Sequence, residues 1–77
     1  MTPGTQPAAL RRGRVVEFDQ HVGLGVVEED GEGTRRYPFH CTEIAGGTRT
    51  IDVGTAVTFG LIAGRQGRWE AGRVAPA

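Results

Sequence analysis

The runs VGLGVV, residues 22–27, and YPFHC, residues 37–41, decide the fold of this chain. Both are short and rich in apolar, β-branched or aromatic residues, as strands are, and the acidic, glycine-bearing residues 29–34 separate them. We therefore expect two neighbouring antiparallel strands joined by a loop. Gly23 and Gly25 leave one face of the first run without side chains at two points. Either a ligand or another backbone approaches closely there, or the strand coils tightly.

Three further strands are expected around this hairpin. In residues 56–62, Val57, Phe59 and Leu61 alternate toward a core. Pro38 donates no ladder hydrogen bond, so its amide position must face an edge or a gap in the sheet. Five short strands at this spacing favour a small all-β barrel over a two-sheet sandwich, and no helix longer than the turn at 42–44 is expected. The five predicted strands are residues 13–19, 23–28, 35–41, 56–62 and 68–74.

The length of 77 residues, 8.2 kDa, predicts one domain. Residues 1–12 contain two prolines and a glycine without periodicity, which indicates a flexible tail, and residues 13–77 form the globular domain. The N-terminus lacks the pattern of a signal peptide, and no apolar run approaches the roughly 20 residues of a membrane span. A single cysteine excludes an intramolecular disulfide. We expect a cytoplasmic protein that does not contact membranes.

Nine arginines balance nine carboxylates, there is no lysine, and the formal net charge is zero. A free-standing nucleic-acid binder is more often basic, because phosphate contacts supply much of its affinity. Zero net charge still allows a local basic patch.

From residue 13 to residue 74 the sequence resembles the cold shock domain, the five-stranded OB-fold of bacterial cold shock proteins. The opening strand has the pattern Gly-x-Val-x-x-Phe-Asp, and VGLGVV stands where the family has KGFGFI. YPFHCTEI stands where it has VFVHFSAI, followed by RTIDVGTAVTF and the closing EAGRV. The resemblance implies a five-stranded antiparallel Greek-key barrel.

The resemblance also implies binding of single-stranded RNA or DNA, which the family achieves by stacking bases on surface aromatics. At those positions this chain departs from the family. Glu17 replaces a Trp, Val16 a Lys and Val22 a basic residue, while Leu24, Val26, Pro38, Cys41 and Thr48 replace Phe residues. We therefore expect weak binding that is not strongly stacking-driven. The predicted nucleic-acid-binding residues are Phe18, Leu24, Val26, His40, Arg14, Arg49 and Arg68.

Two questions stay open at this point. Arginines 14, 49, 65, 68 and 73 either gather around the binding face or are scattered over the surface, and Glu17 and Asp19 would repel phosphate there. Trp69 either replaces lost stacking area or caps the barrel end, and we favour the cap.

The competing hypothesis is a protein-interaction or self-associating module that keeps the fold without the ligand. It rests on the neutral charge and on a contiguous apolar patch, a feature typical of partner sites. The expected patch consists of Val16, Leu24, Val26, Pro38 and Cys41.

Catalysis and metal binding are not expected, and neither is a cofactor. Cys41 would need an oriented base, and the adjacent His40 points to the opposite face of a strand. His21, His40 and Cys41 have no recognisable zinc-ligand spacing. The sequence therefore predicts a binding domain and not an enzyme.

Overall fold

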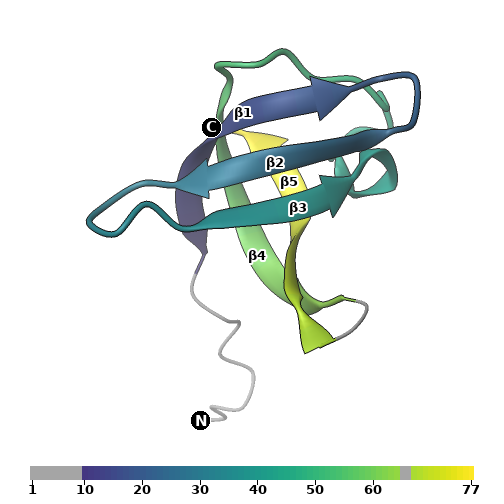
Figure 1. Cartoon of the computed structure of the whole chain (residues 1–77). Helices are drawn as coiled ribbons and strands as arrows, with labels where there is room; N and C mark the ends of the chain where they lie inside the picture. Colours follow the sequence, from purple (N-terminus) through teal and green to yellow (C-terminus); the bar gives the residue numbers. More distant parts are fainter. Residues whose placement is uncertain (1–9, 65–66) are drawn as a thin grey trace, which may run out of the picture.

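The structure, a computed structural model, describes residues 10–64 and 67–77. Within them the chain forms five strands and one short 3-10 helix (Figure 1). The elements are β1 Arg11–Asp19, β2 Leu24–Glu29, β3 Arg36–His40, η2 Cys41–Glu43, β4 Ala56–Ala63 and β5 Trp69–Pro76.

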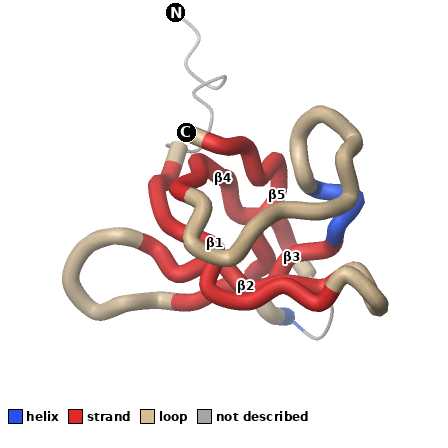
Figure 2. Tube along the Cα trace, turned by 90° about the horizontal axis from the view of Figure 1, so that it is seen from above, coloured by secondary structure: helices blue, strands red, loops and turns tan. Residues whose placement is uncertain are grey.

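The strands form a single antiparallel sheet in the order β3-β2-β1-β4-β5. The sheet coils so that its two edge strands, β3 and β5, contact each other. Viewed from above, β4 and β5 lie on one side of the coil and β2 and β3 on the other (Figure 2). The sheet is barrel-like but not closed. This confirms the all-β, five-stranded, OB-type prediction, and it places Pro38 on an edge strand as expected.

The strand boundaries differ from the predicted ones by at most two residues. β1 begins at Arg11 and not at Gly13, because Arg11 and Arg12 pair with Phe59 and Thr58 of β4. Two residues assigned to the tail therefore belong to the sheet, and residues 1–9 of that predicted tail lie outside the described part. β3 ends at His40 because Cys41 begins the 3-10 turn that was expected one residue later.

The core lies between the two halves of the coiled sheet. All five strands contribute residues to it, and so does Ile44, the residue after η2. At its margin the Tyr37 ring packs on the Phe59 ring, with centroids 6.0 Å apart. Apolar burial of this kind supplies the main driving force for folding. The buried residues are Val15, Val27, Phe39, Ile44, Val57, Phe59, Ala71 and Val74.

A row across the first three strands fixes which side of the sheet faces inward. Gly25 on β2 pairs with Phe18 on β1 and with Phe39 on β3. The two phenylalanine rings lie 6.0 Å apart and nearly parallel, at 12°. A Cβ atom on Gly25 would lie 2.5 Å from the Phe39 ring and 2.9 Å from the Glu17 carbonyl oxygen. The bare face of Gly25 therefore accommodates the chain's own Phe39 and not a ligand.

Gly23 has a comparable role in the β1–β2 turn. Its φ of +75° is a conformation that L side chains rarely adopt, and a Cβ would lie 2.8 Å from Cys41 Sγ. The Gly23 carbonyl accepts a hydrogen bond from the Cys41 amide at 2.8 Å, which extends the β2–β3 pairing into η2.

We predict that Gly25→Ala lowers the free energy of unfolding by about 2 kcal/mol, because the added methyl group overpacks the core against Phe39. Gly60→Ala is the matched control, since nothing lies within 4 Å of a Cβ at Gly60. It should leave stability unchanged or raise it by about 0.5 kcal/mol through the unfolded chain. Urea unfolding followed by circular dichroism measures both. Equal effects of the two substitutions would contradict the packing of Phe39 over Gly25.

Candidate nucleic-acid interface

The side of β1, β2 and β3 that points away from the core carries two cross-strand rows. One row is Asp19, Leu24 and His40, and the other is Glu17, Val26 and Pro38. These two rows flank the inward row of Phe18, Gly25 and Phe39, so the six residues share the opposite surface. We call these six residues the outer face.

A β-bulge in β1 sets the composition of the outer face. The register between β1 and β2 shifts between Val15 and Glu17, so Val16 is an extra residue in β1. Val15 is fully buried. Strict alternation from Val15 would turn Glu17 inward and Phe18 outward, and the bulge reverses both. A carboxylate therefore stands on the outer face, and Phe18 packs on the Phe39 ring in the core.

The centre of the outer face is apolar and slightly hollowed. Leu24 is 45% exposed, Pro38 is exposed and Val26 is half-buried between them. The hollow has a volume of about 380 Å³, and no described residue covers it. Its lining residues are Glu17, Phe18, Asp19, Leu24, Gly25, Val26 and Pro38.

The β1 margin of the outer face is acidic. Glu17 and Asp19 are both exposed, and neither forms an ion pair with the described residues. Asp19 Oδ1 accepts hydrogen bonds from the backbone amides of His21 at 2.9 Å and Val22 at 3.3 Å, which holds the β1–β2 turn. Two negative charges on this margin repel phosphate groups from β1.

The basic groups nearest the outer face are already engaged. Arg36 Nη2 lies 3.6 Å from Glu28 Oε1 in the next row along β2 and β3. Arg14 Nη1 donates to the Gly54 carbonyl at 3.0 Å, so its side chain reaches toward the loop before β4. This loop also pairs with β1 through hydrogen bonds between Val15 and residues 54 and 55.

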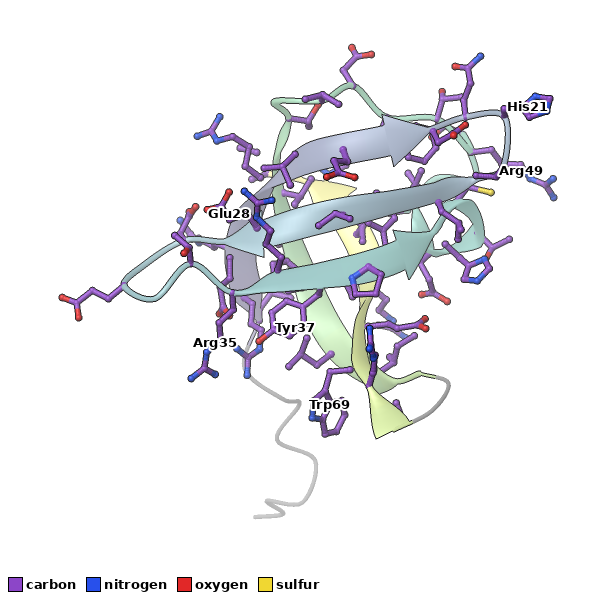
Figure 3. All side chains as sticks on the ribbon, viewed as in Figure 1. His21, Glu28, Arg35, Tyr37, Arg49 and Trp69 are labelled. Carbon is purple, nitrogen blue, oxygen red and sulfur yellow. The ribbon has the colours of Figure 1, made fainter. Side chains whose placement is uncertain are left out.

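The other arginines are scattered and do not gather around the outer face. Arg49 lies in the loop between η2 and β4, and Arg68 precedes β5 beside Trp69. Figure 3 shows Arg49 near the end of the sheet that carries His21, while Trp69 lies at the far lower end. Arg73 sits in β5, where its amide donates to Glu43 Oε1 at 3.0 Å. Arg65 lies outside the described residues.

The structure thus brings together three of the seven predicted site residues, Leu24, Val26 and His40. Phe18 lies beneath them, half-buried, and borders the hollow. The three predicted arginines, at 14, 49 and 68, lie on separate segments.

The predicted apolar patch is only partly formed. Val16 and Cys41 are half-buried, and Cys41 packs against the core beside Gly23. Neither residue lines the hollow. Trp69, for which a barrel cap was favoured, is 57% exposed and is not part of the core cluster.

Within residues 10–64 and 67–77, no group of three or more His, Cys, Asp or Glu side chains is placed to hold a metal ion. No helix in the described segments has the length and apolar character needed to cross a membrane.

The geometry resembles a solved structure, "Drosophila Unr CSD456", with a TM-score of 0.73 over 96% of this chain. The chain has the fold of a cold shock domain. Sequence identity to that structure is 24%, and the chain spans 29% of its length. No protein-family model matches the chain. No curated protein matches it either. The cold shock fold expected from the sequence is therefore confirmed by the structural comparison.

We predict that Phe18→Ala lowers the free energy of unfolding by about 2 kcal/mol, because it removes the ring that packs on Phe39. Leu24→Ala, on the outer face one strand away, should cost only about 0.5 kcal/mol, since much of that side chain is in water. Chemical denaturation of both variants measures the difference. Phe18→Ala with wild-type stability would mean that the Phe18 ring lies on the outer face instead.

Proposed function

We propose that this chain is a nucleic-acid-binding module, not an enzyme, and that it binds single-stranded RNA or DNA weakly through the outer face. The observation that supports this most directly is the open apolar hollow at Leu24, Val26 and Pro38. It lies on the strands with which cold shock domains, the family that the sequence resembles, present their stacking platform. The chain keeps the fold of these domains and an open surface on the same strands, but the side chains of that surface are aliphatic where the family has aromatic ones.

In this proposal the flat apolar face of a base lies on Leu24, Val26 and Pro38. Such a contact is tolerant of sequence, because every base has an apolar π-face. His40 on β3 is the cross-strand partner of Leu24 on β2. Its exposed imidazole adds a ring for stacking and nitrogen atoms for hydrogen bonding. The phosphates of the bound strand lie on the β3 side of the outer face, because the carboxylates of Glu17 and Asp19 on the β1 side repel them.

Two features make the binding weak. No aromatic side chain other than His40 stands on the outer face, so the contribution of about 1–3 kcal/mol per base from aromatic stacking is largely lost. Few free cations border the hollow, so few counterions are released on binding. Each phosphate contact contributes about −0.7 to the slope of log affinity against log salt for a single strand, and we expect a shallow slope.

We predict that Leu24→Ala and His40→Ala each weaken binding of a short oligothymidylate about five-fold, which corresponds to roughly 1 kcal/mol of lost contact. Fluorescence anisotropy of the labelled oligonucleotide at low salt measures the affinity. Val53→Ala is the control, because Val53 is a 60% exposed apolar residue on the loop outside the outer face. Unchanged affinity in both outer-face variants would remove the proposed site.

We further predict that Glu17→Lys raises affinity for the same oligonucleotide about five- to ten-fold at low salt, because it converts repulsion of nearby phosphates into attraction. Glu32→Lys makes the same charge change in the exposed β2–β3 loop, away from the outer face. It should have an effect of less than about two-fold. Equal gains in the two variants would show that only net charge matters and that the strand does not pass Glu17.

A second candidate function, protein recognition, is favoured by the pairing of the apolar hollow with two carboxylates. A partner segment with apolar and cationic side chains would complement both. A short arginine- and leucine-containing peptide that competes with the oligonucleotide, and binds more tightly than it does, would favour this candidate. Self-association would appear instead as a concentration-dependent mass in light scattering.

A further inference from the structure

Trp69 is exceptional among the aromatic residues of this chain. The sequence contains three Phe, one Tyr and one Trp. Phe39 and Phe59 are core residues, and Phe18 and Tyr37 pack against that core. The Trp69 side chain is 57% exposed. The largest aromatic surface that the chain offers to solvent is therefore the indole, and it lies off the outer face (Figure 3).

The local structure explains why this indole is uncovered. Trp69 is the first residue of β5, and its cross-strand partner on β4 is Ala63, whose methyl group is too small to cover an indole. The connection from β4 to β5 begins with Gly64 and also contains Gly67, which has a φ of +73°. Neither glycine offers a side chain to the ring. A large planar apolar group is thus presented at the end of the hairpin.

The charges around Trp69 favour an anionic ligand. Arg68 precedes it and is exposed, and Arg35 is exposed just before β3, the strand that contacts β5. Neither arginine forms an ion pair with residues of the described segments. Figure 3 shows Arg35 below the start of β3 and Trp69 further down, at the end of the β4–β5 hairpin. The neighbouring carboxylate, Glu70, packs against Gly64 of the same hairpin.

We propose that Trp69 is a base-stacking site for single-stranded nucleic acid, with Arg68 and Arg35 holding the adjacent phosphates. A planar apolar ring beside free guanidinium groups complements a base and its phosphate, because tryptophan stacks on any base and arginine pairs with phosphate. The identity of the ligand rests on the proposed function, but the site is a separate surface. β3 carries Pro38 and His40 of the outer face and also contacts β5, so a nucleic-acid strand that continues past β3 leads from one site toward the other.

Because Trp69 is the only tryptophan, the intrinsic tryptophan fluorescence of the chain reports on this site. Titration of the full chain with an oligothymidylate should quench this fluorescence in a saturable way, because a base stacks on the indole. An oligonucleotide of about eight nucleotides is long enough to span more than one site. Trp69→Ala should weaken binding of the labelled oligonucleotide at least five-fold in anisotropy measurements. Trp69→Phe should retain most of the affinity because a ring remains. Ile62→Ala is the control, since Ile62 is a 39% exposed apolar residue on the same hairpin.

The results separate this site from the outer face. Loss of affinity in Trp69→Ala, with Leu24→Ala and His40→Ala unaffected, would support the Trp69 site and overturn the outer-face proposal. Loss only in the outer-face variants, with no quenching in the wild type, would overturn the Trp69 site alone. Absence of any oligonucleotide binding at low salt would overturn both. Equal quenching by a short oligoglutamate peptide would also overturn base stacking, because it would show that the site responds to negative charge alone.

Discussion

The packing of Phe39 over Gly25 is the constraint on which the rest of this structure depends. Because β2 has no side chain at that point, the rings of Phe18 and Phe39 meet at 6.0 Å across three strands and close the core beneath the sheet. Any side chain at residue 25 would separate them. With this row directed inward, Leu24 and Val26 must lie on the opposite side of β2, since side chains alternate along a strand.

The same constraint explains the unusual chemistry of the outer face. The bulge at Val16 lets Phe18 join the inward row, and it consequently places Glu17 outside beside Val26. The chain therefore has a carboxylate and not an aromatic ring at the β1 margin, while its three phenylalanines and its tyrosine lie in the core or pack against it. A small domain gains stability from this arrangement, because large aromatic side chains bury more apolar area than any others. As a consequence, the outer face has no Phe18 ring on which a base could stack.

Much of the fold could be predicted from the sequence, because it depends on local patterns. The glycine-separated apolar runs, the alternation of Val57 and Phe59, and the position of Pro38 each indicated the observed strands. The inward orientation of Phe18 does not follow from alternation along β1, since a bulge is defined by cross-strand pairing and not by one strand, although the resemblance to cold shock domains implied a partly core role for this residue. The exposure of Trp69 likewise depends on the small partner Ala63, and the start of β1 depends on pairing with Phe59 and Thr58, far along the chain.

The site was predicted less completely than the fold. Leu24, Val26 and His40 share a face because period-two alternation and the hairpin pairing are enough to place them. Arg49 and Arg68 lie outside the strands, where no alternation of side chains predicts their direction, and the side chain of Arg14 in β1 is drawn to the Gly54 carbonyl by a hydrogen bond. One measurement tests nucleic-acid binding by the outer face most directly, an amide NMR titration of the labelled domain with a short single-stranded oligonucleotide at low salt. Binding at the outer face predicts shifts at Leu24, Val26 and His40 that diminish with added salt. The absence of such shifts at millimolar oligonucleotide would contradict binding at this face.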